Sequence, residues 1–170
     1  AAHGLAWLAT YVQALRQMQL WAEKLSAEDN FTEVEQLIFQ IGFGEYLAQI
    51  FGGIAMNQGE MLRLHDLGLA QSHQQCANDS AIQTLIQHGN TQAARTRLVE
   101  LMQEHSANIT VGRTGLDDEL EMIREQFRRY AVEKVEPFAH EWHLKDELIP
   151  IEVINELAEL GVFGLTIPEE

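Results

Sequence analysis

The side chains suited to metal binding or nucleophilic attack are few, and their spacing is unfavourable. His140 and His143 stand three residues apart, whereas the zinc-binding helical motif separates two histidines by four residues, and no third ligand is evident. Cys76 is the single cysteine, and His73 could contact it on a helix, but no feature marks a reactive thiolate. We interpret Cys76 as a small interior residue and predict no metal-binding or catalytic residue in this chain.

Two further patterns resemble phosphate-binding motifs, but neither matches such a motif fully. Gly42-Phe43-Gly44 begins like the dinucleotide fingerprint, but Leu47 stands where the third glycine belongs, and no strand pattern precedes the run. Later arginines stand among glutamates at helical spacings, namely Arg124, Arg128 and Arg129. This spacing favours a salt-bridged helix face over a phosphate clamp.

The charge of the chain is strongly acidic and unevenly distributed. Eleven basic and twenty-six acidic side chains give a formal charge of −15, which disfavours nucleic-acid binding because phosphate backbones are repelled. From Thr114 onward there are fifteen acidic and five basic residues, so this asymmetry favours a boundary near Thr114.

Cysteine usage and hydropathy indicate the compartment. A single cysteine excludes an intrachain disulfide and suggests a reducing environment, so we expect a cytoplasmic location. No apolar run reaches eighteen residues, and no signal-peptide pattern opens the chain, so we expect no membrane span. The chain lacks an initiator Met and ends on Pro168-Glu169-Glu170, which we interpret as a piece of a longer protein.

Hydrophobic periodicity predicts two long helices at the start of the chain. Apolar residues recur every three or four positions from about Gly4 to Ala27, which is typical of one helix face. Thr32 and Glu35 then form a capping-box pattern, which predicts that the next helix begins there. This second helix is expected to end at Gly52-Gly53, where a missing Cβ permits a left-handed cap.

The remaining segments also favour helices. We expect them at about 58–67, 80–86 and from Thr91, with Leu101 and Met102 buried in the last of these. A turn-rich linker follows at 108–115. A long helix is expected from Asp117 or Asp118 to about Glu136, with a buried stripe that includes Leu120, and a shorter one at 150–160. No segment alternates like a strand, so the sequence predicts an all-α fold.

The last third of the chain carries a specific run of residues. It comprises Leu116-Asp117-Asp118-Glu119, Arg124 through Phe127, Ala131, Val135-Glu136-Pro137, Ala139, Glu141, Ile149-Pro150 and Leu157 through Glu170. A helix that ends in Leu160-Gly161 and leads through a short apolar stretch into Pro168-Glu169-Glu170 is hard to obtain by chance. The run resembles the first two helices of acyl-CoA dehydrogenases and covers about a third of the chain.

This resemblance implies a flavoprotein. Family members contain FAD, and they remove the α-proton of an acyl-CoA while hydride passes to flavin N5. Their catalytic base is a glutamate in or near the last domain, and nothing in this chain matches it or the flavin-binding strands. The resemblance therefore implies FAD, an acyl-CoA substrate, an electron-transfer flavoprotein as partner and a homo-oligomer, with the catalytic and cofactor-binding residues outside this chain.

The first part of the chain has a resemblance of its own. Glu45 through Ile54 and Asn57-Gln58-Gly59-Glu60 resemble the extension found in one branch of the family, the (2S)-methylsuccinyl-CoA dehydrogenases of the ethylmalonyl-CoA pathway. We therefore expect a helical-bundle extension at 1–112 and the truncated start of the family's amino-terminal α-domain at 113–170.

Within the extension, Gln49-Ile50-Phe51-Gly52-Gly53 is similar to a Gln-x-x-Gly-Gly element of the family. In the last domain of ordinary acyl-CoA dehydrogenases, this element contacts the adenylate half of the flavin across a subunit boundary. Glycines suit that role because a backbone without Cβ atoms lets a phosphate approach its amides. Here the next residues, Ile54-Ala55, depart from the family pattern. We interpret the extension as a decayed copy of the last domain, in which the element only caps a helix.

Two other functions remain open from the sequence. One is a different flavoprotein branch of the same fold, such as an acyl-CoA oxidase-like or alkylation-response protein. The other is a non-catalytic helical interaction module, for which an acidic surface and apolar stripes suffice.

Overall fold

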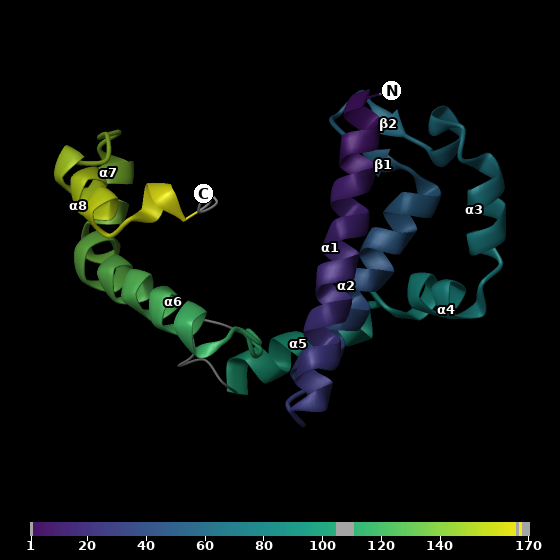
Figure 1. The fold of residues 1–170 in the computed structure, drawn as a ribbon, viewed down its shortest axis with the longest axis horizontal. Coiled ribbons are helices and arrows are strands. Elements are labelled where there is room, and N and C mark those ends of the chain that lie inside the picture. Colours follow the sequence, from purple (N-terminus) through teal and green to yellow (C-terminus); the bar gives the residue numbers. More distant parts are fainter. Residues whose placement is uncertain (1, 105–110, 166, 168–170) are drawn as a thin grey trace. The chain divides into compact units, whose positions relative to one another are not determined.

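The computed structural model of the chain describes residues 2–104, 111–165 and 167. The chain divides into two compact units, Ala1–Gly115 and Leu116–Glu170. Helices dominate both units (Figure 1), which confirms the all-α prediction. The residues for which we made predictions at Asn108, Ile109 and Pro168 through Glu170 lie outside the described ranges.

The first unit is built around one central helix. Two long helices open the chain, as predicted, namely α1 (Ala2–Ala27) and α2 (Glu33–Gly52). They pack against each other and lie side by side (Figure 1). Helix α2 also packs against α4 (Ser80–His88) and α5 (Gln92–Glu104). The Asp79 side chain accepts hydrogen bonds at the start of α4, and the Thr91 hydroxyl accepts one from Ala94 at 3.1 Å at the start of α5. Helix α3 (Ala70–Ala77) was not predicted.

Two glycines allow α2 to approach the end of α4 closely. A Cβ placed on Gly44 would lie 2.7 Å from the Asn90 nitrogen and 2.7 Å from the Leu85 oxygen. A Cβ on Gly89 would lie 2.4 Å from the Gln40 oxygen. These neighbours are backbone atoms and cannot rotate away. The Gly42-Phe43-Gly44 run therefore serves helix packing, at least at Gly44, which is buried.

The segment after α2 is a short hairpin, so the helix predicted at 58–67 is wrong. Strands β1 (Ile54–Ala55) and β2 (Met61–Leu62) pair antiparallel, with Ile54 opposite Leu62. The turn between them is held by Asn57, whose side-chain oxygen accepts from the Gly59 amide at 2.8 Å. Only a 3-10 turn at Leu64–Leu67 remains of the predicted helix.

Two hydrophobic clusters form the core of the first unit. One joins α1, α2 and the hairpin through Leu8, Ile50, Ile54 and Leu62. The other joins α2 to α5 through Leu37, Ala94 and Leu101. Met102, which was predicted to be buried, is 42% exposed. It follows Leu101 directly, so it points to a different face of α5.

In the second unit, one helical run continues through a proline. Helix α6 (Asp118–Tyr130) leads into a π-helical turn at Ala131–Val135 and then into α7 (Glu136–Leu144). Pro137 lies in the first turn of α7, where a missing N–H costs least. The π turn at Ala131–Val135 is wider than an α-helical turn, so the helical run can continue although Pro137 donates no hydrogen bond. The predicted end of this helical run near Glu136 is therefore wrong.

The apolar residues of the second unit are largely uncovered. Helix α8 (Ile151–Glu159) follows α7, and α6, α7 and α8 contain no buried residue. Leu120 is 46% exposed, so its predicted burial is wrong, and Phe163 in the 3-10 turn at Val162–Gly164 is 63% exposed. A few short helices can cover only part of one another's apolar faces, which leaves the rest for further packing partners.

None of the described helices combines the length and the apolar character needed to cross a bilayer.

The close approach at Gly44 makes a direct prediction. Gly44→Ala should lower the free energy of unfolding by about 1–3 kcal/mol, because the new methyl group meets fixed backbone atoms. Gly42→Ala, on the same helix, would meet only the flexible end of Met18. It should be neutral or stabilising, because alanine favours the helix by about 1 kcal/mol over glycine. Urea unfolding of both variants tests this, and equal effects would contradict the packing role.

Candidate functional site

The most deeply buried charged group of the described chain is the carboxylate of Glu35, which is 2% exposed. The Thr32 backbone N–H donates to Glu35 Oε2 at 3.0 Å, and the Thr32 hydroxyl donates to the same oxygen. The Arg113 backbone N–H donates to Oε1 at 2.8 Å. Burial alone would raise the pKa of Glu35, but these hydrogen bonds stabilise the carboxylate and hold its pKa below the ordinary value. The capping pattern read from the sequence is therefore confirmed, and it also reaches a distant segment.

A chain of polar side chains runs through Gln49. The Tyr11 hydroxyl donates to Gln49 Oε1 at 2.7 Å, and Gln49 Nε2 donates to Glu45 Oε1 at 2.6 Å. Asn90 donates to the other oxygen of Glu45 at 2.7 Å, and Arg95 donates to Asn90 Oδ1 at 2.5 Å. The hydrogen bonds from Gln49 and Asn90 lower the pKa of Glu45. Both polar atoms of Gln49 are thus used within the first unit.

The arrangement at Gln49–Gly53 does not fit the pyrophosphate of FAD. Glu45 lies beside Gln49, and its negative charge would repel a phosphate. Gly53 has a φ of +133°, and a Cβ there would lie 2.6 Å from the Met61 sulfur, so the hairpin already covers this glycine. The Gly53 N–H donates to the Gln49 carbonyl at 2.7 Å. The prediction that this element ends a helix is confirmed, although Gly53 leads into β1 and adopts no left-handed cap.

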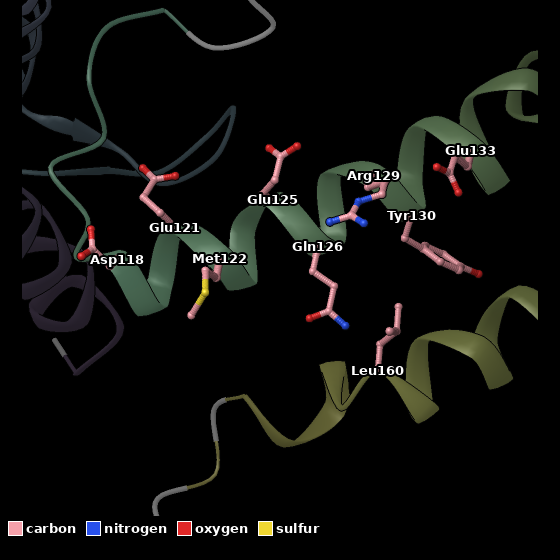
Figure 2. Close-up of a pocket in the computed structure, with 9 residues that line it drawn as sticks. All are labelled: Asp118, Glu121, Met122, Glu125, Gln126, Arg129, Tyr130, Glu133 and Leu160. Carbon is pink, nitrogen blue, oxygen red and sulfur yellow. The ribbon is translucent and has the colours of Figure 1, made fainter.

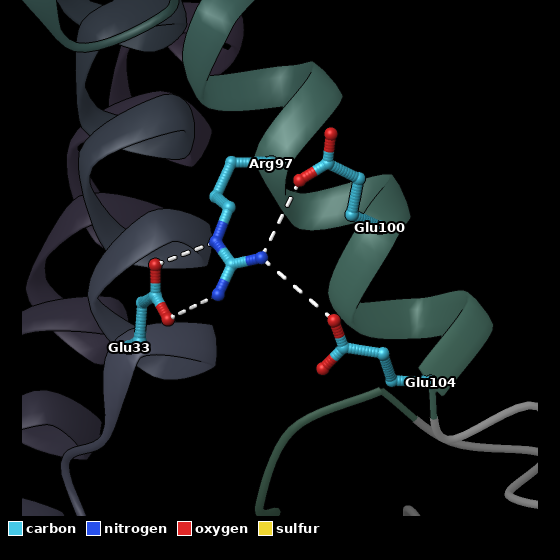
Figure 3. A network of polar contacts seen from close by, with 4 residues as sticks. All are labelled: Glu33, Arg97, Glu100 and Glu104. Atoms are coloured by element: carbon cyan, nitrogen blue, oxygen red, sulfur yellow. Dashed lines mark hydrogen bonds and ion pairs between the residues drawn. The ribbon is translucent and has the colours of Figure 1, made fainter.

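An ion network joins the start of α2 to α5 (Figure 3). Arg97 donates to both oxygens of Glu33, at 2.8 Å and 2.9 Å, and its third nitrogen lies 3.4 Å from Glu100. Glu104 is a further partner at 3.8 Å. The hydrogen bond from Arg97 lowers the pKa of Glu33. Three carboxylates surround one guanidinium, so this network ties two helices together and offers no site for an anion.

In the second unit, a groove lies along α6. Its lining is Asp118, Glu121, Met122, Glu125, Gln126, Arg129, Tyr130, Glu133 and Leu160. Figure 2 shows Met122, Gln126 and Tyr130 on the side of α6 that faces Leu160. The Tyr130 hydroxyl donates to the Val153 carbonyl at 3.2 Å, which joins α6 to α8. Four of the lining residues are acidic and one is basic, so the groove is unsuited to the phosphates of a nucleotide or of CoA.

The salt-bridged face predicted for α6 is confirmed at two of its arginines. Arg124 Nε lies 2.8 Å from Glu121, and Arg128 Nη2 lies 2.5 Å from Glu125. Each pair spans three residues along the helix, and the pairs are partly solvent-exposed, so they support the helix only modestly.

The structure also places the histidines and the cysteine. Cys76 is exposed, so its predicted place in the interior is wrong. The ring of His73 packs on Phe51, with 5.4 Å between the centroids. His140 and His143 lie in α7, which is regular helix despite Pro137. Among the described residues, no group of three or more His, Cys, Asp or Glu side chains could hold a metal ion. The absence of catalytic and cofactor residues stays a prediction.

The sequence did not predict the hydrogen-bond partners of Gln49 and Glu45 that come from other elements. Tyr11 and Asn90 are 79 residues apart yet meet through Gln49 and Glu45. Spacing along one helix predicts Glu45 beside Gln49, because residues four apart share a face. It carries no signal for the two partners from other elements.

The lowered pKa of Glu35 predicts a pH dependence of stability. The ordinary value is 4.5, and the folded-state value is lower. Its contribution is therefore complete above the ordinary value and is lost as the pH falls through the folded-state value. Glu35→Gln should be less stable at neutral pH by about 1–3 kcal/mol, and the difference should shrink in acid. Urea unfolding at several pH values measures this, with the exposed Glu28→Gln as control. A difference that is independent of pH would contradict the assignment.

Known proteins resemble the chain over part or all of its length. Residues 117–170 match the family profile described as acyl-CoA dehydrogenase, N-terminal domain. All 170 residues are 59% identical to the (2S)-methylsuccinyl-CoA dehydrogenase of Cereibacter sphaeroides, and they span 30% of that protein. A glutaryl-CoA dehydrogenase of Desulfococcus multivorans is 36% identical over 56 residues, which are 33% of this chain and 14% of that protein.

These matches cover both parts of the chain. The similarity to the methylsuccinyl-CoA enzyme includes the extension, so both resemblances read from the sequence are confirmed. The chain is therefore similar over its whole length to one acyl-CoA dehydrogenase, of which it spans 30%, and its residues from Asp117 onward match the N-terminal domain of that family.

Proposed function

We propose that the chain is part of an FAD-dependent acyl-CoA dehydrogenase that converts (2S)-methylsuccinyl-CoA to mesaconyl-CoA. The observation that carries this proposal is 59% identity over all 170 residues, extension included, to a protein named for the first of these substrates. The glutaryl-CoA enzyme matches only 56 residues. Similarity over the extension thus favours the methylsuccinyl-CoA branch over the family at large. It also favours an enzyme over a free-standing interaction module.

Under this proposal, the chemistry belongs to residues outside this chain. FAD would accept the hydride, and a glutamate elsewhere in the protein would accept the α-proton. The described residues contribute folded helices and an acidic surface, and the contacts of Gln49 and Gly53 support a packing role for this element over cofactor binding.

The remaining proposals concern the setting of the enzyme. The family resemblance supports an electron-transfer flavoprotein as electron acceptor, a homo-oligomer, a cytoplasmic location and a place in the ethylmalonyl-CoA pathway. We also propose domains at 1–112 and 113–170. The boundary between the compact units at Gly115 and Leu116 supports this division, with residues 113–115 on the side of the extension.

Substrate reduction of the flavin tests the proposed activity. The full-length protein should bleach its flavin absorbance under anaerobic conditions with (2S)-methylsuccinyl-CoA. With glutaryl-CoA, bleaching should be slower by at least about tenfold, which corresponds to about 1.4 kcal/mol in the transition state. Faster bleaching by glutaryl-CoA would assign the enzyme to another branch, and a protein without flavin would favour the interaction module.

The isolated 170-residue segment should not bind FAD, because the flavin-binding strands of the family are not among the elements of its described residues and its acidic groove repels phosphates. Gel filtration with excess FAD and an absorbance scan of the protein peak measure this. A stoichiometric yellow complex would show that a flavin site lies within the segment.

The Gln49 chain gives a sharper prediction. In the full-length protein, Gln49→Ala should leave FAD affinity unchanged, while losing about 1 kcal/mol of stability because Tyr11 and Glu45 lose a partner. Gln58→Ala, in the exposed hairpin turn, should change neither property and serves as control. Flavin titration and thermal unfolding measure the two effects. A loss of flavin affinity of about tenfold, or about 1.4 kcal/mol, on Gln49→Ala would make this loop a cofactor site.

A further inference from the structure

The segment 111–115 closes the first unit by contacts made through its own backbone. Trp21 Nε1 donates to the Arg113 carbonyl at 2.9 Å, and Lys24 Nζ donates to the Gly115 carbonyl at 2.6 Å. The Arg113 N–H donates to the buried carboxylate of Glu35 at 2.8 Å. The three contacts reach the segment from the last turns of α1 and the first turn of α2, so they lie at the end where this helix pair is joined.

Two glycines fit this segment against the helices. Gly112 and Gly115 both have positive φ, of +79° and +68°. A Cβ on Gly112 would lie 3.0 Å from Ile38 Cδ1, and a Cβ on Gly115 would lie 3.2 Å from Trp21 Cδ1. Glycine is therefore favoured at each position for two reasons: the positive φ, and the short distance between the segment and the side chains of the helices.

Glu35 is the group on which this fit depends. Its two oxygens are divided between the cap of α2 and the Arg113 amide. If the segment left, one oxygen of a 2%-exposed carboxylate would lose its partner, which is a costly loss for a buried charge. The burial of Glu35 is thus compatible only with a closed segment.

We propose that residues 111–115 form a strap, locked by Glu35, which completes the extension and fixes the chain two residues before Asp117, the N-cap of α6. The strap is the last part of the first compact unit, and the segment matched by the dehydrogenase family profile begins immediately after it. Opening the strap would remove a hydrogen-bond partner from the buried carboxylate of the first unit.

Amide hydrogen exchange of Arg113 in the full-length protein tests the lock. Glu35→Met keeps the volume of the side chain and removes the acceptor, so it should accelerate exchange of the Arg113 amide by at least about tenfold. Glu33→Met is the matched control, because Glu33 lies on the same first turn of α2 and its carboxylate pairs with Arg97 instead. It should leave exchange at Arg113 unchanged.

Two further variants keep the test decisive if Glu35→Met does not fold. Trp21→Phe retains a ring and removes the donor to Arg113, and Gly112→Ala adds the clashing methyl group. Both should accelerate Arg113 exchange by about tenfold. Gly68→Ala, at a φ of +74° with no neighbour within 4 Å, carries the same backbone strain without the contact, and it should have no effect there.

The strap is refuted if the Arg113 amide exchanges at the rate of an unstructured peptide in the unaltered protein. It is also refuted if Trp21→Phe and Gly112→Ala both leave that rate unchanged while the far-UV circular dichroism is retained.

Discussion

The buried carboxylate of Glu35 is the constraint around which the first unit is organised. A charged group that is 2% exposed is tolerated only when hydrogen bonds replace the water it has lost. Three donors meet this need, two from Thr32 and one from Arg113. One side chain therefore fixes the start of α2 and holds a segment 78 residues further along the chain. These hydrogen bonds stabilise the charged form of Glu35 and thereby lower its pKa.

The hydrogen bonds of Gln49 support our interpretation that the Gln49–Gly53 element only ends a helix. A cofactor loop needs amides and side chains that are free to meet a phosphate. Here Gln49 bridges Tyr11 and Glu45, and Gly53 lies against Met61 of the hairpin. The polar atoms of Gln49 are therefore used within the unit that contains them.

The two units differ in how completely they bury their apolar residues. The first has two core clusters and a central helix that contacts its neighbours on several sides. In the second, the helices from Asp118 to Glu159 contain no buried residue. Its stability must depend on apolar contacts beyond those present in this unit. The chain spans 30% of the length of the methylsuccinyl-CoA enzyme that it resembles.

Local sequence determined the helices and their ends where the signals are short-range. The stripe of α1, the Thr32–Glu35 cap and the salt-bridged face of α6 were all predicted, because each depends on residues three or four positions apart. The family resemblance was likewise carried by a contiguous run. The helix predicted at 58–67 and the helix end predicted near Glu136 were wrong. A hairpin and a π turn provide backbone hydrogen bonds there, and hydrophobic periodicity does not predict either of them.

Only the tertiary structure decided which distant groups meet. The pairing of Glu35 with Arg113, the use of Gln49 by Tyr11 and the contact of Gly44 with Gly89 join residues between 38 and 78 positions apart. Each of these contacts depends on how the helices pack. The sequence does not indicate which distant residue will form a hydrogen bond with a given polar side chain. The sequence by itself determined most of the helices and the resemblance to acyl-CoA dehydrogenases, and the packing of those helices decided what their polar side chains do. The physical reason is that helix formation depends on residues close together in the sequence. A polar group, in contrast, can be buried only when the fold places a hydrogen-bond partner beside it in place of water.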